Sequence, residues 1–141
     1  MSELAFADTN LFIRLITRDD PVQTEAVISL LKQAGVGEVT LVTNVTVIAE
    51  LVWVMESKGA DQATIRDAIW SILNTPGIQV DAPHLVAQAI DIYAAKNIDF
   101  VDAYNISWMF ENDLTTAYTF DKRHFSRVVG VDVIVPGETS A

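Results

Sequence analysis

Residues 4–16 read LAFADTNLFIRLI: a short apolar run, an aspartate, and then apolar residues at helical spacing. The run at 4–7 is too short for a helix, so it predicts a buried strand that ends at Asp8. Apolar side chains at positions 11, 12, 15 and 16 predict that a helix follows. In α/β folds, ligands gather beyond the carboxyl ends of the strands, which makes Asp8 a candidate functional residue.

The same alternation continues along the chain. Helices are expected over 21–32, 45–58, 61–73, 83–96 and 101–111, and strands over 39–42, 78–80, 115–120 and 131–135. Residues that favour helix ends mark several boundaries, among them Asp20-Pro21 and Gly59. Brief apolar strands that alternate with helices predict a parallel α/β sheet covered on both faces. We expect a single domain over residues 1–135 and a polar tail over 136–141.

The composition is typical of a folded protein of the cytoplasm. Half of the 141 residues are hydrophobic and none is cysteine, which excludes a disulfide framework and a thiolate zinc site. Glu3 stands where a signal peptide would carry a basic residue, and no apolar run is long enough to cross a bilayer. We therefore expect a soluble, cytoplasmic chain without a membrane partner.

The net charge of −10 indicates mainly a solubilising acidic surface and is unusual for a protein that binds nucleic acid. Two observations weaken this argument against nucleic-acid binding. Carboxylates that hold divalent cations lose effective charge when they are loaded. In addition, three of the nine basic residues lie within one six-residue stretch, namely Lys122, Arg123 and Arg127.

Four acids occupy positions that need an explanation. Asp8 and Asp121 each follow a strand, Asp102 lies at the start of a helix three residues after Asp99, and Glu50 lies in mid-helix among mostly apolar neighbours. The aspartates could simply cap helices, and Glu50 could pair with an arginine, although we do not expect it to be merely solvated. Four carboxylates brought together by the fold would repel one another unless a cation lay among them. Oxygen ligands favour the hard ions Mg²⁺ and Mn²⁺.

In four segments the chain resembles the PIN domain, and within it the VapC-type toxins of bacterial toxin–antitoxin pairs. These segments are Asp8-Thr9-Asn10, Ala49-Glu50-Leu51-Val52, Asp99-Phe100-Val101-Asp102-Ala103 and Thr119-Phe120-Asp121-Lys122-Arg123-His124-Phe125. No single segment is specific to this family, but the order, the spacing and the placement after strands of the four segments are specific when taken together. The resemblance implies a three-layer α/β/α PIN-like domain with a short, mainly parallel central sheet.

The resemblance also implies an activity, that of an endoribonuclease that depends on Mg²⁺, or on Mn²⁺, and cuts RNA with a metal-activated water. The implied catalytic acids are Asp8, Glu50, Asp102 and Asp121, and the implied metal ligands are the same four with Asp99 as a fifth. The implied partners are an RNA substrate, a cognate VapB-like antitoxin and a second copy of the chain in a homodimer.

Further polar and basic side chains are expected to surround the metal ligands or to contact the RNA. Those expected to surround the metal ligands or to contact RNA are Thr9, Asn10, Thr119 and Asn105, the last of which stands where several relatives carry histidine. His124 is expected to be a surface residue. Five basic residues are candidates for holding the RNA backbone, although short basic clusters are commonly just solvated surface. They are Arg14, Arg18, Lys122, Arg123 and Arg127.

Three alternatives stay open from the sequence. A PIN-type nuclease could act on DNA or on structured nucleic acid, although no DNA-binding module is appended. A receiver-like signalling module shares the α/β pattern, but paired acids would follow its first strand, and Asp8-Thr9-Asn10 does not provide them. A PIN scaffold without catalytic activity would bind without cutting, and the complete set of four acids argues against it.

Overall fold

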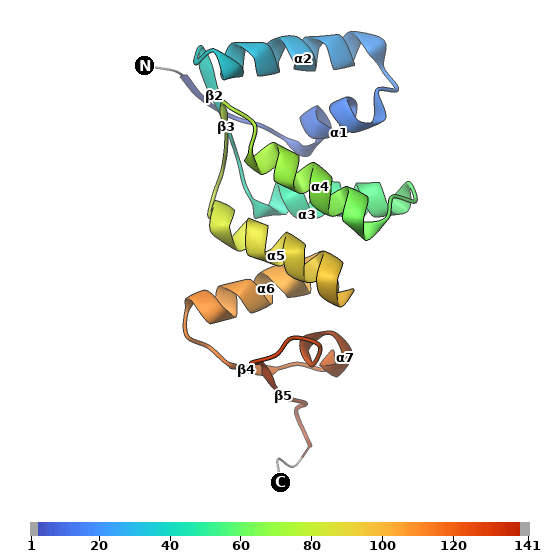
Figure 1. The fold of residues 1–141 in the computed structure, drawn as a ribbon, viewed down its shortest axis with the longest axis vertical. Coiled ribbons are helices and arrows are strands. Elements are labelled where there is room, and N and C mark those ends of the chain that lie inside the picture. The colour runs from blue at the N-terminus through green and yellow to red at the C-terminus, as the bar shows by residue number, and fades with distance from the viewer. Residues whose placement is uncertain (1–2, 139–141) are drawn as a thin grey trace. The chain divides into compact units, whose positions relative to one another are not determined.

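The computed structural model describes residues 3–138, in which short strands alternate with helices (Figure 1). The chain packs as two compact units, the first ending at Pro83 and the second beginning at His84. The strand pairs in the described residues are all parallel. The expected α/β class with a short parallel sheet is therefore confirmed. Within residues 3–138, no helix combines the length and the apolar character needed to cross a membrane.

The first unit combines a three-stranded sheet with four helices. Its strands are ordered β1-β2-β3 and are β1 (Glu3–Phe6), β2 (Val39–Thr43) and β3 (Ile78–Val80). Its helices are α1 (Thr9–Thr17), α2 (Pro21–Gly35), α3 (Val45–Ser57) and α4 (Gln62–Leu73). Helix α2 packs on β2 and α4 packs on β3. The largest fully buried side chains in this unit include Phe12, Leu41, Ile48, Leu51, Ile65 and Ile69.

Capping side chains explain where three of these helices begin. The side chain of Asp20 accepts a hydrogen bond from the amide of Gln23 at 3.1 Å, and Asn44 and Asp61 make the equivalent bonds for α3 and α4. Each bond satisfies a backbone donor that has no partner inside the helix. These local signals put the helix starts where the sequence predicts them.

Gly77 allows the turn before β3 to approach α2 closely. Its φ is +86°, and a Cβ at this position would lie 2.3 Å from the backbone oxygen of Ala34. The Gly77 carbonyl accepts a hydrogen bond from the amide of Leu41 at 2.8 Å, which connects this turn to β2. Only glycine permits both the left-handed backbone and the close contact.

The second unit contains α5 (Pro83–Lys96), α6 (Phe100–Glu111), β4 (Thr116–Tyr118), α7 (Lys122–Phe125) and β5 (Asp132–Ile134). Tyr93 of α5 meets Phe100 of α6 edge to face, with ring centroids 6.4 Å apart. Strands β4 and β5 form a separate parallel pair. Helix α7 packs against both α6 and β5, so the last part of the chain is anchored on the helix that carries Asp102.

Two expectations differ from the structure, and one short helix adds to them. Strand β1 is not fully buried: Leu4 and Phe6 lie on the same face of the sheet, are 70% and 63% exposed, and line an open groove. The strand expected over 115–120 is limited to Thr116–Tyr118. Helix α7 was not expected, because four residues are too few to show a periodicity.

The end of the chain is described only in part. Residues 136–138 follow β5 in a turn, in which the amide of Glu138 donates to the carbonyl of Val135 at 3.0 Å. Residues 139–141 of the expected polar tail lie outside the described residues, as do Met1 and Ser2.

Candidate metal centre

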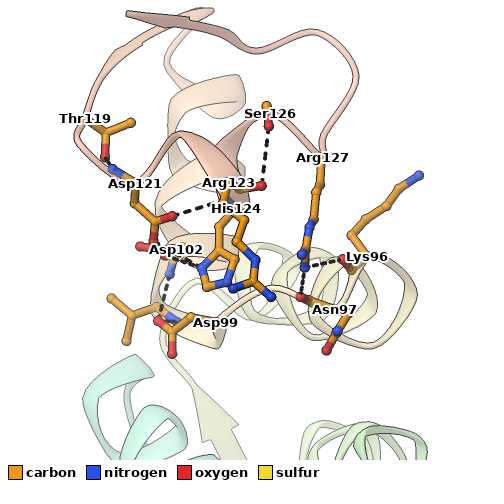
Figure 2. A network of polar contacts seen from close by, with 11 residues as sticks. Lys96, Asn97, Asp99, Asp102, Thr119, Asp121, Arg123, His124, Ser126 and Arg127 are labelled. Carbon is orange, nitrogen blue, oxygen red and sulfur yellow. Dashed lines mark hydrogen bonds and ion pairs between the residues drawn. The ribbon is translucent and has the colours of Figure 1, made fainter. Parts of the chain in front are cut away.

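Three side chains of the second unit converge on one point (Figure 2). Asp102 lies in the first turn of α6, Asp121 lies just before α7, and His124 lies within α7. The Nδ1 atom of His124 is 3.2 Å from Oδ2 of Asp102 and 3.1 Å from Oδ2 of Asp121. One ligand atom from each residue lies within 4.8 Å of the other two, which makes this cluster a candidate metal site within residues 3–138.

Thr119 and Asp121 shape the loop between β4 and α7. The amide of Thr119 donates to the carbonyl of Ile134, and its Oγ1 accepts from the amide of Asp121 at 2.9 Å. Asp121 in turn caps α7, because its Oδ1 accepts from the amide of His124 at 3.2 Å. One carboxylate oxygen of Asp121 therefore fixes the helix, while the other faces the imidazole (Figure 2).

Asp99 is the N-cap of α6. Its Oδ2 accepts from the amides of Val101 and Asp102, at 3.1 and 3.3 Å. These two bonds hold the first turn of α6, from which the Asp102 side chain extends. The structure therefore gives Asp99 a capping role, and its expected part as a fifth metal ligand stays a proposal.

The environment of Asp102 favours a nearby cation. Burial raises the pKa of this carboxyl, and the negative charges of Asp99 and Asp121 add to that effect, while the hydrogen bond with His124 opposes it. A raised pKa means that the ionised carboxylate is destabilised by its surroundings. A divalent ion beside the carboxylate would offset both the burial and the repulsion.

The donor atoms fit a divalent metal ion. Two carboxylate oxygens are the ligands that Mg²⁺ and Mn²⁺ prefer, and an imidazole nitrogen is a common ligand of transition ions. Asp102 and His124 are each about three-quarters buried, and the side chain of Asp121 is more exposed, at 44%.

Asp8 extends from the end of β1 in the first unit. The amide of the preceding residue, Ala7, donates to the carbonyl of Val42 at 2.9 Å, and its carbonyl accepts from Oγ1 of Thr43 at 3.0 Å. Asp8 occupies the N-cap position of α1, but within residues 3–138 its side chain makes no capping hydrogen bond. Its exposed carboxylate is therefore not used to start the helix.

Glu50 is exposed on α3, so its apolar neighbours along the chain do not bury it, and its expected catalytic role stays a proposal. The buried residues of α3 are Val47, Ile48, Leu51, Val52 and Met55, which form one face of the helix. Glu50 points away from that face, as does Trp53, which is 66% exposed. The apolar composition of α3 extends over its exposed surface, so apolar neighbours of Glu50 do not imply burial.

The predicted acids are thus divided between the two units. Asp102 and Asp121 come together in the second unit, and Asp8 and Glu50 belong to the first. Among the expected supporting residues, Thr9 is buried with no hydrogen-bond partner for its Oγ1 among the described residues, and Asn10 and Asn105 are exposed.

Two of the five basic candidates stabilise local structure. Arg14 forms an ion pair with Asp19 at 3.2 Å and also bonds Gln23. Arg127 donates to the carbonyl of Lys96 at 3.4 Å and to that of Asn97, at the carboxyl end of α5 (Figure 2). The remaining three side chains are exposed, namely Arg18, Lys122 and Arg123.

The sequence analysis missed His124 as a member of this cluster, and it missed Thr43, which supports the end of β1 next to Asp8. The available signal for His124 was its spacing, because the third residue of a helix lies beside the residue that caps it. Thr43 carried no such signal, since its hydroxyl reaches a carbonyl 36 residues away along the chain.

The model of one known protein family matches most of the chain. The family model of the PIN domain matches residues 5–131, which include Asp8, Glu50, Asp102 and Asp121. No curated protein and no solved structure matches the chain. The resemblance to the PIN domain is therefore confirmed, whereas the narrower resemblance to the VapC-type toxins stays a prediction.

Proposed function

Because the chain belongs to the PIN domain family, whose members are generally nucleases, we propose that it is an endoribonuclease that requires a divalent metal ion. The observation that supports this proposal most is the convergence of Asp102, Asp121 and His124 on one point. Two of these three residues are acids that the PIN-like sequence pattern contains.

We assign Asp8 and Glu50 to the same catalytic site as Asp102 and Asp121. The four acids follow the order and spacing of the PIN-like segments, and all lie within the residues that the family model matches. The carboxylate of Asp8 is not used for helix capping, and Glu50 is exposed, so both side chains are available to a ligand. Asp99 is a further ligand in this proposal, in addition to its role as a cap.

The side chains have distinct tasks in this mechanism. A divalent ion, Mg²⁺ or Mn²⁺, would supply an activated water and would neutralise charge on the phosphate. Asp8, Asp102 and Asp121 would hold that ion, and Glu50 would orient the attacking water. Thr119 contributes by fixing the backbone of Asp121 through the 2.9 Å hydrogen bond.

Polar and basic residues around the acids are proposed to hold the RNA. Thr9, Asn10 and Asn105 are assigned to the substrate or to the surroundings of the metal ligands. Backbone phosphates would be bound by exposed cations. Arg14 and Arg127 are weaker candidates, since their guanidinium groups already bind neighbouring residues; the stronger ones are Arg18, Lys122 and Arg123.

The biological role that we propose is that of a cytoplasmic VapC-type toxin. It would form a homodimer, and a cognate VapB-like antitoxin would neutralise it. The proposal rests on the family membership and on the four PIN-like segments.

The nuclease proposal is tested by cleavage assays on the purified chain. We expect labelled RNA oligomers to be cut internally with Mg²⁺ or Mn²⁺ and to stay intact with a chelator. We expect a single-stranded DNA oligomer of the same sequence to be cut far more slowly. Equal cleavage of both would reject the RNA preference, and cleavage that persists in the chelator would reject the metal-dependent mechanism.

A further inference from the structure

We propose that His124 is a direct ligand of the divalent ion and gives the site a preference for Mn²⁺ over Mg²⁺. The proposal rests on the metal site proposed above, and it adds a nitrogen ligand to a set otherwise made of carboxylates. Figure 2 shows the imidazole facing both Asp102 and Asp121.

Two distances in this cluster are close to the edge length of a coordination octahedron. In six-coordinate sites with metal–ligand distances near 2.1 Å, two adjacent ligand atoms lie about 3.0 Å apart. The Nδ1 atom of His124 lies 3.2 Å from a carboxylate oxygen of Asp102 and 3.1 Å from one of Asp121. A metal ion can therefore bind Nδ1 and both oxygens with small adjustments of the side chains.

The backbone holds the imidazole in this place. The amide of His124 is bonded to Oδ1 of Asp121, and the next residue, Phe125, is buried. Helix α7 is thereby held in place by the Asp121 cap at its start and by the buried side chain of Phe125. An imidazole positioned in this way needs little ordering when it binds a metal, which favours affinity.

The chemistry of nitrogen ligands sets the expected preference. Mg²⁺ is a hard ion that is usually bound by oxygen, whereas imidazole suits transition ions. The neutral ring would bind through Nδ1 and carry its proton on Nε2. Removal of the imidazole should therefore weaken Mn²⁺ binding much more than Mg²⁺ binding.

The test measures metal binding to the full chain after the metal has been stripped with a chelator. Free Mn²⁺ is followed by electron paramagnetic resonance, and Mg²⁺ is followed by its competition with Mn²⁺. The variant is His124→Ala, and the matched control is His84→Ala, whose ring also meets a carboxylate, with Nε2 2.9 Å from Oε1 of Glu111. Circular dichroism shows whether both variants are folded.

We expect His124→Ala to weaken Mn²⁺ binding by at least about tenfold, as the loss of groups around a bound metal generally does, and to change Mg²⁺ binding by less than about threefold. His84→Ala should change neither. Electron spin echo measurements on bound Mn²⁺ should show coupling to an imidazole nitrogen in the wild type and in His84→Ala, but not in His124→Ala.

Two results would overturn the proposal. If His124 acted only as a counter-ion to the carboxylates, its removal would tighten the binding of both metals. If it played no part, binding and the nitrogen coupling would be unchanged. Failure of the nuclease proposal looks different, because the wild type would then bind Mn²⁺ through nitrogen without cutting RNA.

Discussion

Asp102 is a carboxylate that the fold makes harder to ionise. Burial, and then the charges of Asp99 and Asp121, raise its pKa above the ordinary 3.8, against the opposing hydrogen bond with His124. The folded chain therefore binds the Asp102 proton more tightly than the unfolded chain does. Below pH 3.8 this group has no destabilising effect, and its ionisation lowers the stability of the fold as the pH rises through the raised pKa.

The change Asp102→Asn removes that unfavourable charge. In the presence of a chelator at pH 7, we expect the variant to unfold about 1–4 °C above the wild type, and we expect the difference to vanish at acidic pH. Thermal unfolding followed by circular dichroism measures both values. A melting temperature that falls at pH 7 would contradict the electrostatic account.

Asp61 serves as a control, because its pKa is shifted in the opposite direction to that of Asp102. Hydrogen bonds from the side chain and the backbone of Thr64 lower the pKa of Asp61, so its ionised form stabilises the fold at neutral pH. Asp61→Asn should therefore lower the melting temperature at pH 7 or leave it unchanged. A rise equal to that of Asp102→Asn would show that the effect belongs to any loss of acidic charge.

Thr43 and Thr9 are both buried threonines, but among the described residues only the hydroxyl of Thr43 has a hydrogen-bond partner. The hydroxyl of Thr43 donates to the carbonyl of Ala7, whereas Oγ1 of Thr9 has no partner within the described residues. We expect Thr43→Val to lower the free energy of unfolding by about 1–3 kcal/mol, because the Ala7 carbonyl loses its bond. Thr9→Val should be neutral or stabilising. Urea unfolding measures both, and an equal loss in the two variants would contradict this assignment.

At the scale of elements, short segments place the functional groups and long helices provide the core. Helix α7 has only four residues, yet its cap and its contacts with α6 hold His124 against Asp102. Strand β1 is also short, and the bonds of Ala7 to β2 determine where Asp8 leaves the sheet.

The turn before β3 tests this view of the elements. Gly77→Ala would force a Cβ into the backbone of Ala34, at 2.3 Å, in addition to straining a φ of +86°. We expect it to destabilise the fold by at least about 3 kcal/mol, as measured by urea unfolding.

Gly37→Ala is the matched control for that turn. Gly37 has the same φ of +86°, but a Cβ there meets nothing within 4 Å. Gly37→Ala should lower the free energy of unfolding only through backbone strain, by about 1–2 kcal/mol. Similar losses in the two variants would mean that the contact with Ala34 does not matter.

At the scale of the whole molecule, local signals were predictable from the sequence and contacts between elements were not. Asp20, Asn44 and Asp61 act within a few residues, so the helix starts followed from the sequence. The meeting of His124 with Asp102 depends on the packing of α7 against α6, which no local pattern encodes.

Burial was predicted less well than secondary structure. The apolar run of β1 suggested a buried strand, but Leu4 and Phe6 are exposed at the edge of the three-stranded sheet. The burial of Glu50 was overestimated for a related reason, because α3 also carries apolar residues such as Trp53 on its exposed side. Composition describes how much apolar surface an element has, and the packing of the chain determines which part is covered.

The central claim is that acids from both ends of the chain serve one metal-dependent reaction. RNA cleavage rates in Mg²⁺ by Asp8→Asn, Asp121→Asn and the double variant test it most directly, with Asp67→Asn, an exposed partner of Arg66, as the control. We predict that each single change slows cleavage by at least about 100-fold and that the double variant is little slower than either, since residues that act as a unit are not additive. A wild-type rate in Asp8→Asn, or losses that multiply in the double variant, would contradict the claim.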